Sequence, residues 1–326
     1  MDKLDLKDRK LLYELDGNSR QSIQKLAKKL SLSKDAVSYR INKLLKSGII
    51  KSFNAVVDSG KLGYYSFRIF LKFYGISPEK EKEIMTFLLK NKNLVWVVQV
   101  EGNWDINTWF LYKSIDEMNL FWQELITKYN NYLEKKEFGI YSEINYFGRE
   151  FLIENKLNKL SIPIVSLPKK IKLDEKDLLI VNLLANNART PIIEIANKVK
   201  ITPKTAINKI RRLEKERVIV GYRTEFSLEK LGYKYYKIHL SMFNTTAEKI
   251  KRLKQEIKQN PNIIFEDIVL GGYDFEFEVQ IENEDKLREL LENIRVEFSD
   301  IIKDYEIMHY YKEYRLRFFP DVLATK

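Results

Sequence analysis

The stretch SIQKLAKKLSLSKDAVSYRINKLLKSGII, residues 22–50, decides the fold class. Apolar residues recur with helical spacing from Ile23 to Leu30 and again from Val37 to Leu44, which predicts two amphipathic helices. Ser33 lies between them as a suitable N-cap. A further apolar stripe from Leu11 to Leu15 predicts a helix before this pair. Three short helices with a tight turn between the last two are typical of a helix-turn-helix, whose final helix enters the major groove of DNA.

The same pattern returns 169 residues later as TPIIEIANKVKITPKTAINKIRRLEKERVIV, residues 190–220. Here Thr202 is the expected cap, and Pro203 takes the first helical position, where its missing N–H costs nothing. The register continues without a gap, and identical pairs include Arg20 and Arg189, Gly102 and Gly271, Asp105 and Asp274, and Tyr141 and Tyr310. We therefore expect one fold, present twice.

The basic charge of the chain is concentrated in these two segments. The net charge is +11, and residues 1–60 carry 13 Lys and Arg against 7 Asp and Glu, while residues 169–230 carry 15 against 8. The remainder is slightly acidic. Two separate basic segments indicate double-stranded DNA as the partner.

The exposed faces of the two third helices carry residue types that suit DNA recognition. Asn can bond an adenine edge, Arg or Lys can bond guanine, and further Lys residues neutralise phosphates. The predicted DNA-binding residues are Lys34, Ser38, Tyr39, Asn42 and Lys43 in the first copy and Lys204, Thr205, Asn208, Arg211 and Arg212 in the second. The β-rich runs 48–51 and 218–221 would form wings that touch the DNA backbone.

An α/β unit is predicted after each basic segment. Phe67, Ile69 and Leu71 alternate with polar residues such as Arg68, which is typical of a strand. The elements that follow give the order βαββαβ, a ferredoxin-like unit with two helices on one sheet face. The other face should be rich in aromatic residues and free to pair.

The expected fold class is therefore α+β, with two tandem copies of a winged helix-turn-helix domain followed by a ferredoxin-like βαββαβ domain. The expected boundaries are 1–60 and 61–150 for the first copy, 151–170 for a linker, and 171–229 and 230–326 for the second copy. The linker is predicted because 151–170 contains Pro163 and Pro168 and shows no apolar period.

Composition excludes much chemistry. The absence of Cys excludes disulfides and thiol nucleophiles, and only two His exist, His239 and His309, each on a predicted strand where a hydrogen-bonded structural role is expected. No catalytic residue, metal site or cofactor site is predicted. No apolar run approaches the roughly 18 residues that span a bilayer, so a cytoplasmic protein without a membrane partner is expected.

The ordered pattern LDLKDRKLL at residues 4–12, the helix-turn-helix stretch and the βαββαβ unit resembles the Lrp/AsnC (feast/famine) transcription regulators, and LDEKDLLIV at residues 173–181 repeats it. The resemblance covers nearly the whole chain, twice. It implies a sequence-specific DNA-binding regulator rather than an enzyme, with α/β domains that pair through their sheets. It also implies an amino-acid-like effector near a Gly-x-x-Asp turn, here Gly102 to Asp105 and Gly271 to Asp274.

Alternatives remain at this point. Asp105 and Asp274 could simply cap hairpin turns, and bulky Trp104 and Tyr273 lie beside them. Because one chain carries two unlike heads, we expect an intrachain pseudo-dimer, a homo-oligomer, or both. Sirohaem decarboxylases, which bind a tetrapyrrole, are relatives of this fold, and a protein that coats DNA without sequence preference would share the basic heads.

Overall fold

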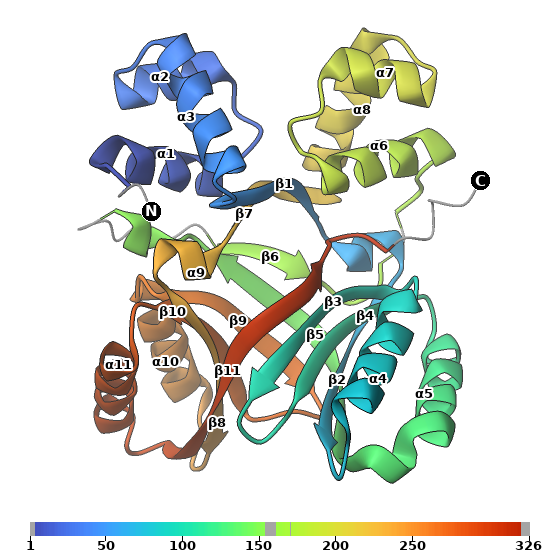
Figure 1. The fold of residues 1–326 in the computed structure, drawn as a ribbon, viewed down its shortest axis with the longest axis vertical. Coiled ribbons are helices and arrows are strands. Elements are labelled where there is room, and N and C mark those ends of the chain that lie inside the picture. Colours follow the sequence, from blue (N-terminus) through green and yellow to red (C-terminus); the bar gives the residue numbers. More distant parts are fainter. Residues whose placement is uncertain (1–3, 154–160, 170, 321–326) are drawn as a thin grey trace.

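The computed structural model describes residues 4–153, 161–169 and 171–320. It shows two similar halves joined into one body, with two helical heads above a barrel (Figure 1). The first half contains α1 (Leu6–Gly17), α2 (Ile23–Leu30), α3 (Lys34–Lys46), β1 (Ile50–Val57), η1 (Ser59–Leu62), β2 (Tyr65–Phe73), α4 (Pro78–Lys90), β3 (Leu94–Glu101), β4 (Ile106–Tyr112), α5 (Ile115–Tyr129), η2 (Asn130–Tyr132) and β5 (Leu133–Phe147).

A 3-10 turn, η3 (Glu150–Leu152), and a strand, β6 (Ser161–Val165), lead to the second half. That half contains α6 (Glu175–Asn186), α7 (Ile192–Val199), α8 (Pro203–Lys215), β7 (Ile219–Phe226), α9 (Leu228–Leu231), β8 (Lys234–Met242), α10 (Ala247–Gln259), β9 (Ile263–Leu270), β10 (Phe275–Ile281), α11 (Glu284–Glu297) and β11 (Ile302–Leu316). Three helices followed by βαββαβ, twice, confirm the predicted fold class.

The two four-stranded sheets close into one antiparallel barrel. The first unit has the order β5-β2-β4-β3 and the second β11-β8-β10-β9, and they join at both edges through the pairs β3–β11 and β5–β9. Each sheet edge therefore finds its partner in the other half of the same chain. Closure removes exposed edges, which otherwise present unpaired N–H and C=O groups.

Strands β1 and β7 pair with each other rather than within their own halves, with Ala55 opposite Tyr222 and Asn54 opposite Arg223. The runs expected as wings, 48–51 and 218–221, consist of the first residues of these two strands and the residues just before them. Each strand lies against the first helix of the other half's head, because Asn54 Nδ2 donates to Ala185 O at 2.8 Å and Thr224 Oγ1 donates to Leu15 O at 2.9 Å. Neither head is thus a self-contained domain.

Part of the predicted linker forms a buried strand rather than an exposed connection. In its described residues, 151–153 and 161–169, β6 adds to β5, with Ile162, Ile164 and Val165 buried. Residues 154–160 and 170 of that segment, and the ends 1–3 and 321–326 of the expected domains, lie outside the described residues. The apolar alternation in this strand covers only five residues, and the two prolines of the segment favoured a loop. The sequence pattern therefore did not reveal β6.

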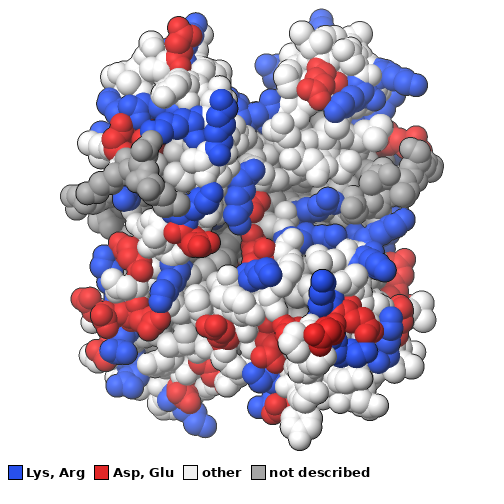
Figure 2. Space-filling view, in the orientation of Figure 1, with Lys and Arg blue, Asp and Glu red and all other residues white. Residues whose placement is uncertain are grey.

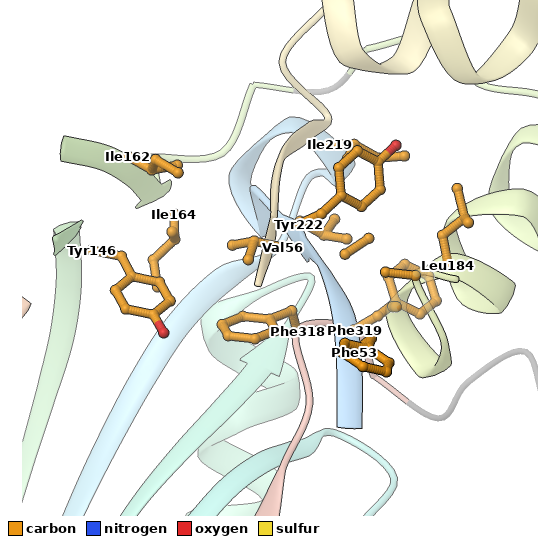
Figure 3. Close-up of a cluster of buried hydrophobic side chains, with 14 of the residues drawn as sticks. Phe53, Val56, Tyr146, Ile162, Ile164, Leu184, Ile219, Tyr222, Phe318 and Phe319 are labelled. Carbon is orange, nitrogen blue, oxygen red and sulfur yellow. The ribbon is translucent and has the colours of Figure 1, made fainter. Parts of the chain in front are cut away.

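One apolar core connects the heads to the barrel. Side chains from β1, β6, β7, α6 and the segment after β11 meet below the heads, among them Phe53, Tyr222 and Phe318 (Figure 3). Two further clusters lie between each sheet and its own helices, α4 and α5 in one half and α10 and α11 in the other. Burial at about 25 cal/mol per Å² of apolar surface makes these contacts the main stabilising term.

The inner face of the barrel carries the expected aromatic rings, among them Trp96, Trp109 and Tyr310, and it also buries several charged side chains. Arg68 on β2 and Lys237 on β8, which occupy equivalent positions in the repeat, are both fully buried. Glu276 on β10 forms ion pairs with both side chains, with 3.1 Å separating its Oε2 from Lys237 Nζ. Although burial acts to raise the pKa of Glu276, the charges of Lys237 and Arg68 lower it to about 2. This carboxylate is therefore ionised wherever the protein is folded near neutral pH.

Replacing Glu276 by alanine should destabilise the chain by about 3–5 kcal/mol, because it leaves two buried cations without their shared carboxylate. The free energy of unfolding in urea measures this loss. The matched control is Glu284→Ala, since Glu284 is exposed and pairs with Lys234 at the surface, and it should change stability little. Equal losses in both variants would contradict the buried network.

Candidate nucleic-acid interface

Each head owes its geometry to local capping. Asp5 and Asp174 begin α1 and α6, each in a capping box with the Asp three residues later, Asp8 or Asp177. These boxes satisfy backbone N–H groups that a helix start leaves free. The expected caps of the third helices are confirmed, since Ser33 Oγ accepts from Ala36 N at 3.1 Å, and Thr202 caps α8 with Pro203 at its start.

The turn between the second and third helix is tight in both heads. Ser31 and Lys200 end α2 and α7 in the left-handed conformation, with φ of 53° and 54°. This conformation is uncommon for residues other than glycine, and it occurs at equivalent positions, so the turn begins with the same backbone conformation in both heads. Val37, Ile41 and Leu44 bury one face of α3, and Ala206, Ile210 and Leu213 bury the same face of α8.

The structure brings most of the predicted DNA-binding residues onto the opposite face of these helices. Exposed residues are Lys34, Tyr39, Asn42 and Lys43 on α3 and Lys204, Asn208, Arg211 and Arg212 on α8, while Ser38 and Thr205 are half-buried beside them. Tyr39 has 69% of its surface exposed, which is unusual for so large a ring.

Two basic residues of α8 are used inside the head. Arg212 forms an ion pair with the buried carboxylate of Asp177, and Lys209 Nζ lies 3.0 Å from the same group. In the first head Arg40, equivalent to Lys209, lies 2.6 Å from Asp8 Oδ1. These cations fix the third helix against the first, so Arg212 has a structural partner that its place in the sequence did not reveal.

The two exposed faces differ at equivalent positions. Tyr39 corresponds to Asn208, Asn42 to Arg211, and acidic Asp35 to basic Lys204 at the shift of 169 residues. The second head is thus more basic and presents different hydrogen-bonding groups. Figure 2 shows Lys and Arg side chains on both heads and in the band beneath them, with Asp and Glu more frequent over the barrel.

A reciprocal contact holds the heads together, and we call it the arginine clasp. Arg20 Nη1 donates to the carbonyls of Ala188 and Thr190, the latter at 3.1 Å. Its equivalent, Arg189, donates to Ser19 O at 2.7 Å and Gln21 O at 3.2 Å. Sequence comparison identified this identical Arg pair but gave no reason for it; the structure supplies one.

A second contact between the halves occurs once only, at Asp16. Its carboxylate accepts from Arg149 Nη1 at 2.5 Å and from Arg223 Nη1 at 2.9 Å, and all three side chains are buried. The position equivalent to Asp16 is Ala185, and the position equivalent to Arg223 is Asn54. Sequence reasoning missed this network because the repeat offers no second copy of it.

Each Gly-x-x-Asp turn lies against the other half of the barrel, and ring contacts through Phe70 and His239 connect Trp104 of the first turn to Tyr273 of the second. A side chain at Gly102 would meet Ile307 O of β11, and one at Gly271 would meet Phe138 O of β5. Asp105 Oδ2 accepts from Phe73 N at 2.6 Å, and Asp274 Oδ2 accepts from Met242 N at 2.7 Å. Both carboxylates therefore bond the end of a neighbouring strand.

The two histidines have different surroundings. His239 is buried, stacks on Tyr273 with ring centroids 3.9 Å apart, and has no hydrogen-bond partner among the described residues. Burial lowers its pKa to about 3, so it is neutral. His309 Nδ1 lies 3.0 Å from Glu101 Oε2. The expected hydrogen bond is thus present at His309 only.

Among the described residues, none of the helices has the length and apolar character that spanning a bilayer requires. The same residues hold no group of three or more His, Asp or Glu side chains arranged to bind a metal ion.

Comparison with known proteins agrees with this geometry. The model of winged helix-turn-helix DNA-binding domains matches twice, at residues 4–51 and 173–220. Among curated proteins, the HTH-type transcriptional regulator Ptr1 of Methanocaldococcus jannaschii is 32% identical over 123 residues, which is 38% of this chain and 82% of Ptr1. The HTH-type transcriptional regulator LrpA of Pyrococcus horikoshii is 31% identical over 27% of this chain and 60% of its own length.

Among solved structures, the siroheme decarboxylase NirDL is similar over 95% of this chain and 92% of its own, with a TM-score of 0.63 and 13% identity. At that identity the likeness concerns the fold alone.

The fold and the two heads define a helix-turn-helix transcription regulator. The chain belongs to the Lrp/AsnC family, in a fused tandem arrangement with two copies of the family's architecture in one polypeptide.

Replacing Arg20 by methionine should release the two carbonyls that it binds in the other head and loosen the clasp. We expect amide hydrogen exchange to become about tenfold faster or more in residues 19–21 and 188–190, because an unmet buried acceptor costs about 1–3 kcal/mol. Lys28→Met is the matched control, since Lys28 is exposed on α2. Unchanged protection in Arg20→Met would refute the role of the clasp.

Proposed function

We propose that this regulator recognises an asymmetric DNA site, with one half-site for each head. The observation that carries the proposal is the pair of third helices, whose heads are joined by β1–β7 and the clasp and whose exposed residues differ at equivalent positions. In a symmetric dimer identical heads read identical half-sites, and the site is a palindrome. Two unlike heads on one frame favour two unlike half-sites.

Within this proposal the side chains of the two heads have different roles. Asn42 and Tyr39 of the first head, and Asn208 and Arg211 of the second, lie at the centre of the exposed faces and would contact base edges. Lys34, Ser38, Lys43, Lys204 and Thr205 flank them and would bind phosphates. Arg212 would act through Asp177, by keeping α8 at its angle. Segments 1–60 and 171–229 thus read DNA, and 61–150 and 230–326 pair to hold them as an intrachain pseudo-dimer.

We further propose that the chain acts by binding and does not catalyse tetrapyrrole chemistry. The two curated relatives described above are named transcriptional regulators, and the buried histidine, His239, is neutral and enclosed by Phe70 and Tyr273. The visible absorbance band of iron-uroporphyrin III should not shift when the purified protein is added. A shift of this band that saturates at one equivalent would favour a function like that of the sirohaem decarboxylases.

Selection from random duplex DNA at several salt concentrations tests the asymmetric site. We expect one motif with two unequal half-sites to be enriched. A perfect palindrome would overturn the proposal, and salt-sensitive binding without enrichment would indicate a protein that coats DNA.

Paired variants at equivalent positions sharpen the test. Asn42→Ala and Arg211→Ala should each relax the preference at one half-site only, with a loss of about 1–3 kcal/mol for the base that the side chain reads. Binding is measured on duplexes altered in one half-site at a time. Loss at both half-sites in either variant would contradict the separate roles of the heads.

A further inference from the structure

A cavity of about 690 Å³ lies between the barrel and the paired strands β1 and β7, which we call the head platform. Its walls come from both halves, because β3, β4, β5, β9 and β11 contribute from the barrel, while Lys51 of β1 and Glu225 of β7 contribute from the platform. Aromatic rings predominate, among them Trp96, Trp109, Tyr141 and Phe265. A cavity of this size and composition is typical of a site for one small organic molecule.

One wall residue offers a hydrogen bond that the described protein does not use. Trp109 lines the cavity with 6% of its surface exposed, and its indole Nε1 has no acceptor among the described residues. A buried indole N–H usually has a partner, because leaving it unmet costs free energy. The wall of the cavity therefore contains an unmet hydrogen-bond donor.

Two carboxylates meet beside this aromatic wall. Lys51 Nζ lies 3.4 Å from Glu225 Oε1 and 3.8 Å from Glu313 Oε1, and it is the cation between them. Glu313 accepts from Trp96 Nε1 at 2.8 Å, and Glu225 accepts from Ser52 Oγ at 2.9 Å. Burial, and then the charge of Glu225, raise the pKa of Glu313 to about 7. One half-exposed lysine thus leaves this pair of carboxylates short of positive charge.

The charged groups of the other basic side chains on the wall contact partners other than Glu225 and Glu313. Arg149 pairs with Asp16, Lys234 Nζ lies 2.7 Å from Glu284, and Lys312 Nζ lies 4.6 Å from the ring centroid of Tyr314. Deeper in the cavity, Glu278 and Asp267 add carboxylates near Lys237. The lining therefore suits a cation better than an anion.

We propose that this cavity binds a small organic cation, an aromatic amine whose ammonium group lies beside Glu225 and Glu313 and whose ring and oxygen lie against the tryptophans. Aromatic walls favour such a ligand through ring contacts and cation–π attraction. This site lies away from the Gly-x-x-Asp turns, whose carboxylates are bonded to strand ends.

The position of the site gives it a way to act on DNA binding, and this part rests on the proposed function. Glu225 lies on β7, the platform strand that follows the helices of the second head. Glu313 lies on β11 of the barrel. A cation held by both carboxylates would tie the platform to the barrel. A ligand that binds one arrangement more tightly shifts the population toward it.

Isothermal titration calorimetry with three matched probes tests the proposal: tyramine, a cation; 3-(4-hydroxyphenyl)propionate, an anion; and tyrosine, which carries both charges. We expect one tyramine per chain and weaker binding of the other two. Glu313→Gln should weaken tyramine binding about tenfold or more, since the amide can still accept a hydrogen bond but no longer carries the negative charge that pairs with the ammonium group. Glu83→Gln, a surface control on α4, should leave it unchanged.

Trp109→Phe keeps the ring and removes the N–H, so it should weaken binding by a smaller factor and serves as a second variant should Glu313→Gln fold poorly. The proposal is overturned if tyramine does not bind at millimolar concentration, if the anion or tyrosine binds more tightly, or if neither variant changes the affinity. DNA binding is measured on the same samples. Failure to bind DNA with tyramine binding intact would count against the regulator function and leave the cavity assignment standing.

Discussion

Pairing of strands across the two halves is the constraint on which the rest of the structure depends. A four-stranded sheet with helices on one face has two unpaired edges and one uncovered face, and both are costly in water. The joins β3–β11 and β5–β9 satisfy all four edges at once and turn the uncovered faces inward. The additional pair β1–β7 places each head on a strand from the other half. The heads are consequently oriented by the barrel rather than by a hinge.

Fusion of the halves permits differences that an identical pair could not tolerate. Glu276 forms ion pairs with both Arg68 and Lys237, and its equivalent in the first half is Asn107. Two copies of either half would place two cations, or an excess of carboxylates, in the same buried space, and a buried charge without a partner costs several kcal/mol. Asp16 is a second example, because it pairs with two arginines and has no acidic equivalent in the second half. Unlike interiors and unlike heads therefore occur in the same molecule.

Much of the fold was predictable from the sequence because helix caps and apolar periods are local. Ser33, Thr202 and the 169-residue repeat identified both heads, and the order βαββαβ followed from strand alternation. What could not be predicted depends on contacts between the halves. Arg68 and Lys237 occur at polar positions of alternating strands and look exposed in sequence, yet each is buried because the opposite half of the chain covers it. Glu225, Glu313 and Trp109 come from three separate strands, so no spacing in the sequence relates them.

Pairing of the two sheets within one chain can be tested with a single cross-link. The chain has no cysteine, so Glu101→Cys with His309→Cys, at opposed positions of β3 and β11, introduces the only thiols. After oxidation at low protein concentration, the account predicts a disulfide within the chain, with faster migration than the reduced form on a denaturing gel and no covalent dimer. A disulfide-linked dimer as the main product would show that the sheets pair between chains, and would contradict the account.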